Sequence, residues 1–230
     1  LHRLMAVFPV PAKALQPLDL GEEATPAKPA EKQPQWVPLA RSQVQVVRTV
    51  PGLAIGDDRE AELMILLEVL GGSSGRLFQA LREERGLTYG VSADAVIGLR
   101  GGAVTIHFST KPERLNESLQ ALEGALGQLI NSGPTAEEVD RARRYLKGVR
   151  RVSRQTAISR GQELVLDVAY GLGVGRSEAL HLELDKVRPE KVRDLAQELF
   201  RPSQTHTILL GPQPKEEEAK PSVSLLDDPS

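Results

Sequence analysis

The sequence contains no cysteine. This absence excludes disulfide bonds, thiolate nucleophiles and metal sites that need a cysteine ligand. The formal net charge is only -2, so no overall field draws the chain to nucleic acid or to an anionic membrane. No apolar run approaches the roughly 18 residues of a membrane-spanning helix, and residues 1–12 lack the long apolar core of a secretory signal. We expect a soluble protein without nucleic-acid or membrane partners, in the cytoplasm or the periplasm if the source is bacterial.

The histidine pattern of a zinc peptidase is missing as well. The chain has four histidines, and neither HExxH nor HxxEH, which pair two zinc ligands with a glutamate base, occurs in it. His107 and His206 fall in expected strands, where histidines are usually ordinary half-buried residues. The sequence therefore predicts no metal site, no cofactor and no catalytic residue in this chain.

The composition is that of an ordinary globular protein, with 230 residues, 40% of them hydrophobic and 26% charged. Residues 9–38 are rich in proline and show almost no periodicity, while residues 211–230 combine prolines with the acidic run 216–218. We predict an extended linker over residues 1–36, one folded domain over 37–212 and a solvated acidic tail over 213–230. The chain begins with Leu1 rather than Met, which fits origin in a longer polypeptide.

The hydrophobic pattern of the expected domain predicts both helices and strands. Strands are expected over 43–50, 87–96, 103–109 and 205–210, with a hairpin turn at 98–102. In 43–50 the apolar positions change phase after Val46, which indicates a slip. Helices are expected over 57–70, over the leucine stripe that follows Pro112, after the capping box at Thr135, and from Pro189. This order predicts an α+β fold, with a mixed, mostly antiparallel sheet and helices packed on one face.

The glycine-rich stretch 71–75 matches GxSxG, the nucleophile elbow of α/β hydrolases, with Ser73 as the nucleophile and His206 downstream in the expected order. That elbow needs a strand directly before the serine, whereas residues 57–70 are expected to be helical. A turn between two helices is the ordinary interpretation, and a serine hydrolase that uses Ser73 is the alternative.

Four basic side chains share one face of the helix that follows Thr135: Arg143, Lys147, Arg150 and Arg154. A solvated surface is the usual explanation of such a stripe. It could also guide an acidic partner or substrate, and the pattern leaves open whether it contacts a partner.

Arg82 and Tyr89 form a further candidate site. Gly86 should end the helix one turn after Arg82, so the sequence separation of seven from Arg82 to Tyr89 spans only about 15 Å of backbone and both side chains can reach one ligand. A guanidinium donates up to five hydrogen bonds and a phenol donates one, which suits holding a peptide carbonyl.

The same spacing also allows an ordinary structural role for both residues. In that interpretation Arg82 pairs with Glu83 or Glu84 on the helix surface, and Tyr89 fills the core beside Leu87. Spacing alone favours this second interpretation.

Residues 71–90 closely resemble the signature of the non-catalytic half of the pitrilysin/insulinase-type inverted zinc peptidases, which include the mitochondrial processing peptidases. Gly71 to Phe78 is similar to the glycine turn of that family, and Arg82 and Tyr89 are similar to its arginine and tyrosine at this same separation. Residues 135–147 resemble the family's helix with a Thr-x-x-Glu cap, and residues 187–199 resemble its last helix. The resemblance covers nearly the whole expected domain.

In that family two similar α+β halves enclose a chamber for an extended peptide. The resemblance implies that Arg82 and Tyr89 bind substrate, and that zinc lies in an HxxEH-bearing catalytic half absent from this chain, on the same polypeptide or on a separate subunit. It also implies that this chain is inactive alone. A structural or assembly domain without substrate contact is the alternative.

Overall fold

The computed structural model of this protein describes residues 34–212. Residues 1–33 of the linker that we predicted over 1–36, and the whole of the tail that we predicted over 213–230, lie outside the described residues. The elements are, in chain order, β1 (Gln35–Pro38), β2 (Val44–Gly52), α2 (Glu60–Gly71), α3 (Arg76–Phe78), the π-helical turn η1 (Gln79–Glu83), β3 (Val91–Ile97), β4 (Gly102–Thr110), η2 (Pro112–Arg114), α4 (Leu115–Ser132), α5 (Ala136–Ser153), α6 (Ala157–Ala169), α7 (Arg176–Glu183), η3 (Leu184–Lys186), α8 (Pro189–Leu199), η4 (Pro202–Gln204) and β5 (His206–Gly211).

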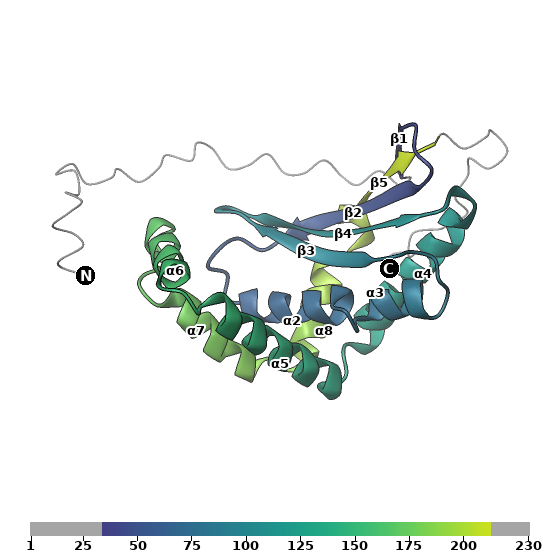
Figure 1. Ribbon diagram of the computed structural model, residues 1–230. Helices are drawn as coiled ribbons and strands as arrows, with labels where there is room; N and C mark the ends of the chain where they lie inside the picture. The colour runs from purple at the N-terminus through teal and green to yellow at the C-terminus, as the bar shows by residue number, and fades with distance from the viewer. Residues whose placement is uncertain (1–33, 213–230) are drawn as a thin grey trace.

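The five strands form one mixed sheet in the order β1-β5-β2-β4-β3. Every pairing is antiparallel except that of β1 with β5, which is parallel. The helices lie against one face of this sheet, and within residues 34–212 no helix covers the other face (Figure 1). The predicted α+β fold with helices on one face is confirmed. β1 crosses the boundary that we predicted between residues 36 and 37.

The expected slip in the second strand does not occur. Val44, Val46, Arg48 and Val50 all point into the core, and Val47 points to the open face. Arg48 is only 4% exposed, and it is tolerated there because it forms an ion pair with Glu123 of α4 and its Nε donates a hydrogen bond to Thr207 Oγ1 at 3.1 Å. A buried arginine whose charge is paired and hydrogen-bonded can hold a core position of a strand.

The helices predicted by pattern are present, one strand and one helix were missed, and one strand was predicted to start too early. The leucine stripe of α4 faces the core, and Thr135 starts α5 with the expected capping box. The pattern missed β1 and α7, which are short and lack a clear periodicity. The strand expected over 87–96 is wrong at its start, since β3 begins only at Val91.

The turn between α2 and α3 holds the GxSxG stretch. Ser73 is exposed there and follows a helix rather than a strand, so the geometry of a nucleophile elbow is absent from it. Gly71 ends α2 against β3, and a Cβ atom at this position would lie 2.4 Å from the backbone nitrogen of Ala93. Glycine is therefore required for α2 to approach β3 this closely.

We expect Gly71→Ala to lower the free energy of unfolding by about 2 kcal/mol, because the new methyl group forces α2 away from β3. Gly148→Ala is the matched control, since a Cβ at Gly148 in α5 meets nothing within 4 Å. This control should raise stability by about 0.5–1 kcal/mol through better helix propensity. Urea unfolding followed by circular dichroism measures both changes, and equal midpoints for the two variants would contradict the close approach.

Candidate functional site

Arg82 and Tyr89 lie together at the surface. The guanidinium carbon of Arg82 is 5.0 Å from the centre of the Tyr89 ring and 4.8 Å from the centre of the Phe78 ring. Both distances are within the range of a cation–π contact. The guanidinium thus contacts two aromatic rings, and Phe78, one helical turn before Arg82, is the member of this cluster to which sequence reasoning assigned no role of its own.

The helix that carries Arg82 contains a π-helical turn. The backbone N–H of Glu84 donates to the carbonyl of Gln79 at 3.0 Å, which is the five-residue spacing of such a turn. The helix then ends at Gly86, whose φ is +57°, and the N–H of Leu87 donates to the carbonyl of Leu81 at 2.7 Å. π-helical turns often occur at functional sites, and the glycine provides the left-handed conformation that reverses the chain.

Tyr89 follows in a short loop that is anchored from three sides. The N–H of Gly90 donates to the hydroxyl of Thr88 at 3.2 Å, and that hydroxyl donates to the Gly90 carbonyl at 2.8 Å. The buried hydroxyl of Thr110 donates to the Leu87 carbonyl at 2.9 Å, and Arg114 donates to the carbonyl of Arg85 at 3.2 Å. Hydrogen bonds from the Thr88 side chain replace a strand ladder here, which explains why β3 starts later than predicted.

The structural role considered for the two residues is not observed. Within residues 34–212 the Arg82 side chain makes no ion pair with Glu83 or Glu84, and its contacts are the two rings. Tyr89 is 88% exposed rather than packed in the core. The interpretation favoured by spacing alone is therefore wrong, and the site presents a stacked cation and an exposed phenol to solvent.

An ion pair holds the start of this helix in place. Arg76, at the first turn of α3, donates to both carboxylate oxygens of Glu138 in α5 at 2.8 Å and to the Gly133 carbonyl at 2.8 Å. Burial on its own would raise the pKa of Glu138, but the hydrogen bonds from Arg76 and Thr135 outweigh it and lower that pKa. This pair fixes α3 relative to α5, and thereby positions Phe78 and Arg82.

A polar groove of about 460 Å³ lies between this helix and α4. Arg76 and Glu138 line it, together with Gln79, Glu84, Gln120 and Gln128. Arg82 and Tyr89 are not among its lining residues. The candidate site is thus an exposed corner rather than a pocket, which is an arrangement suited to a large or shared ligand.

His107 and His206 lie apart in the sheet. His107 of β4 and His206 of β5 are separated by β2, because both strands pair with it. His107 instead contacts Ser92 at 3.1 Å and lies 3.8 Å from Asp94, all three side chains being on the open face of the sheet. Within the described residues, no group of three or more His, Cys, Asp or Glu side chains is placed to bind a metal ion. The side chains here do not fit a zinc site.

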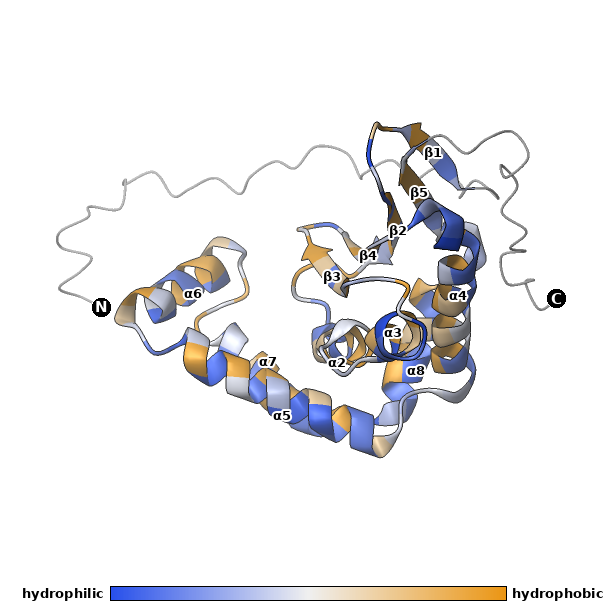
Figure 2. Ribbon diagram, turned by 45° about the vertical axis from the view of Figure 1, so that its right-hand side comes forward, coloured by the Kyte–Doolittle hydropathy of each residue, from blue (hydrophilic) through white to orange (hydrophobic). Residues whose placement is uncertain are grey.

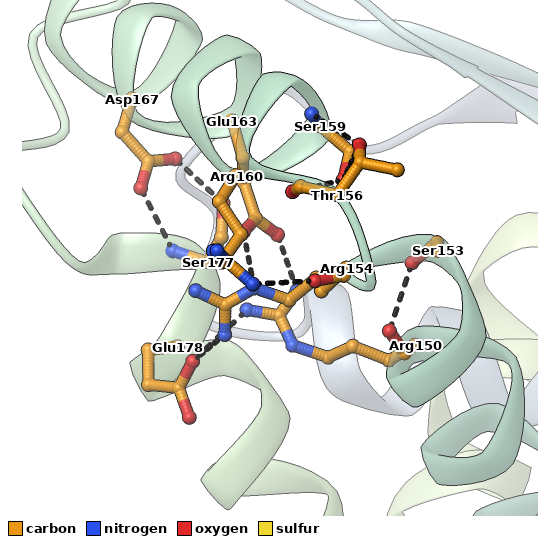
Figure 3. A network of polar contacts seen from close by, with 10 residues as sticks. All are labelled: Arg150, Ser153, Arg154, Thr156, Ser159, Arg160, Glu163, Asp167, Ser177 and Glu178. Carbon is orange, nitrogen blue, oxygen red and sulfur yellow. Dashed lines mark hydrogen bonds and ion pairs between the residues drawn. The ribbon is translucent and has the colours of Figure 1, made fainter.

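The basic stripe of α5 is neutralised within the chain. Lys147 pairs with Asp185, and Arg143 pairs with Asp140 and donates to the carbonyls of Leu184 and Val187. Figure 3 shows the remaining part, in which Arg150 and Arg154 lie between Glu163 of α6 and Glu178 of α7. The stripe therefore joins helices of this domain.

None of the helices among residues 34–212 has the length and apolar character needed to cross a bilayer.

A family model, the peptidase M16 inactive domain, matches residues 6–146 of this chain. An uncharacterized zinc protease of Bacillus subtilis, YmxG, is 32% identical over 151 residues, which make up 65% of this chain and 37% of that protein. The chain thus spans little more than a third of the length of this relative.

Solved structures show the same fold. The peptidase M16 inactive domain from Pseudomonas fluorescens superposes with a TM-score of 0.75 at 22% identity, over 84% of this chain and 46% of that one. The inactive peptidase domain of a putative zinc protease from Bordetella parapertussis gives a TM-score of 0.65 at 21% identity, over 75% of this chain and 96% of that one.

We expect Glu138→Gln to destabilise the protein by about 2 kcal/mol at pH 7, since it removes a charged acceptor from Arg76. The folded pKa of Glu138 lies below its unfolded value. The stabilisation is therefore fully present above the unfolded pKa of about 4.3 and is lost as the pH falls through the folded pKa.

Urea midpoints measured between neutral and acidic pH test this expectation. The difference in urea midpoint between the Glu138→Gln variant and the unaltered protein should become smaller below about pH 4. Glu137→Gln is the control, because Glu137 is the exposed neighbour in the same first turn. A gap that stays constant with pH would contradict the role assigned to the Glu138 charge.

Proposed function

This chain belongs to the peptidase M16 inactive-domain family, and from this we propose that it is the substrate-binding half of a zinc metallopeptidase. In this proposal it holds extended peptides against an HxxEH-bearing catalytic half, encoded on the same polypeptide or as a separate subunit. The observation that carries the proposal is the exposed cluster of Arg82 between the Phe78 and Tyr89 rings.

The stacked arrangement leaves the hydrogen-bonding edge of Arg82 available. Aromatic rings contact the guanidinium carbon, while the N–H donors lie in the plane of the group and point away from the rings. Within the described residues these donors have no carboxylate partner. Stacking also limits the motion of the side chain, so less conformational entropy is lost when a ligand binds.

Arg82 and Tyr89 together suit the recognition of a peptide carbonyl. In the proposed complex, Arg82 donates hydrogen bonds to the carbonyl oxygen of the scissile bond, and the Tyr89 hydroxyl adds one more. These donors strengthen their bonds as negative charge develops on that oxygen. Zinc in the partner half would supply the activated water, and this chain would supply position and charge.

An assembly domain that has lost substrate contact is the alternative of a different class. The free donors of Arg82 and the exposure of Tyr89 favour substrate contact, because a domain that serves only for assembly has no need of an unpaired stacked cation. A serine hydrolase is not supported, since Ser73 follows a helix.

We expect Arg82→Ala to lower kcat/KM for peptide cleavage by about 10²–10³-fold, the effect of removing one donor to an oxyanion. Tyr89→Phe should lower kcat/KM by about tenfold, because it removes one hydrogen bond and keeps the ring. The assay follows a quenched, unstructured peptide mixed with this chain and the HxxEH-bearing half.

Arg144→Ala is the matched control for this assay, because Arg144 is an exposed arginine of α5 away from the site. It should leave kcat/KM unchanged. Normal cleavage by both site variants would overturn substrate contact at this corner.

The chain by itself should cleave no peptide, and a zinc chelator should abolish cleavage by the mixture. Ser73→Ala should leave the activity of the mixture unchanged, because Ser73 lies in a turn that follows a helix and not in a strand-to-helix elbow. Cleavage by the chain alone that persists with chelator and disappears in Ser73→Ala would establish a serine hydrolase instead.

A further inference from the structure

Helix α6 turns its apolar side outward. Ile158, Val165 and Val168 follow one another at helical spacing and are 75%, 66% and 58% exposed. We call these three residues the outer face of α6. A helix at the surface of a complete domain normally buries its apolar stripe. The outer face of α6 is apolar but exposed, whereas a domain that functions alone would bury it.

The opposite side of α6 is polar and faces the rest of the chain. Glu163 pairs with Arg150 and Arg154 of α5. Asp167 is 5% exposed, and its carboxylate accepts hydrogen bonds from the backbone N–H of Ser177 at 3.1 Å and from its hydroxyl at 2.7 Å, at the start of α7 (Figure 3). These contacts fix the rotation of α6, so the helix cannot turn its apolar side inward without breaking them.

The position of α6 also leaves its outer face uncovered. In Figures 1 and 2 the helix stands beyond the end of the sheet at which the β3–β4 hairpin turns, and Figure 2 shows hydrophobic residues along it. The loop to α7 passes through Gly171, Gly173 and Gly175, all with positive φ. Exposed apolar patches of this kind mark interaction surfaces.

We propose that the outer face of α6 is the surface on which the HxxEH-bearing half docks. This inference rests on the proposed function and names the part of the chain that makes the contact. The Bacillus relative and the Pseudomonas structure extend well beyond the part that resembles this chain, which covers 37% of the first and 46% of the second. A second half of similar size is thus available to cover α6, and apolar side chains on it would match the aliphatic outer face.

The docking surface is separate from the substrate site. Arg82 and Tyr89 lie at the end of the domain where β3 begins, whereas α6 stands beyond the opposite end of that strand (Figure 1). Substitutions in the two places should therefore affect different measurements. Those at α6 change the affinity between the halves, and those at Arg82 change turnover in the assembled pair.

The test uses the purified 230-residue chain and the HxxEH-bearing half produced as a separate polypeptide, with their Kd measured by isothermal titration calorimetry. Ile158→Gln combined with Val165→Gln should raise this Kd about a hundredfold, because two aliphatic side chains are no longer buried. Val37→Gln is the matched control, since it changes an exposed valine of β1 at the other edge of the sheet, and it should leave Kd unchanged.

Turnover by the double variant at saturating concentrations of the partner should equal that of the unaltered pair. Arg82→Ala should show the reverse pattern, with normal Kd and reduced turnover. All the variants change exposed side chains, so their urea midpoints should match that of the unaltered chain, which separates a loss of affinity from a loss of folding.

Two outcomes would overturn the inference, and they can be told apart from failure of the proposed function. If the unaltered halves bind and the double variant binds equally well, the docking surface lies elsewhere and the proposed function stands. If the chain alone sediments as a dimer that the double variant dissociates, a second copy covers α6. If the unaltered halves never bind, the proposed function itself fails.

Discussion

The close approach of α2 to β3 determines the arrangement of the rest of this domain. Gly71 has no side chain at the point where a Cβ would lie 2.4 Å from the Ala93 nitrogen. Because α2 ends against the sheet there, the following turn places α3 at the adjacent corner, and Arg76 then reaches Glu138. Each of these contacts positions the next element, and the last of them sets the position of Arg82. One missing methyl group thus sets where the exposed cation stands.

Structural features that depend on residues close together in the chain could be predicted from the sequence. The leucine stripe of α4 and the capping box at Thr135 each depend on neighbours close in the chain, and the sheet followed from alternating β-branched residues. The core position of Arg48 could not be predicted, because it depends on Glu123 and Thr207, which are far away in the sequence. Spacing alone placed Tyr89 in the core for a different, local reason, because the hydrogen bonds between Thr88 and Gly90 compete with strand formation.

For the candidate site, the pair of residues could be predicted from the sequence, but their arrangement could not. Arg82 and Tyr89 came from spacing and from a family resemblance, and the structure brings them together with Phe78 on one exposed corner. The basic stripe of α5 shows the opposite case. The four basic residues do share one face of α5, as their spacing predicted. Their partners Glu163, Glu178 and Asp185 lie in later helices. The charge pattern alone therefore did not reveal that the stripe forms ion pairs within the domain.

The two sides of α6 respond differently to dissolved salt. Its inner side depends on partly exposed ion pairs, which are screened as ionic strength rises and the Debye length falls below about 8 Å. Its outer face is aliphatic, and sulfate or phosphate strengthens the burial of such surface. A kosmotropic salt therefore loosens the anchor of this helix while it favours contact at the outer face. The salt concentration of the surroundings therefore acts on the two sides of α6 in opposite directions.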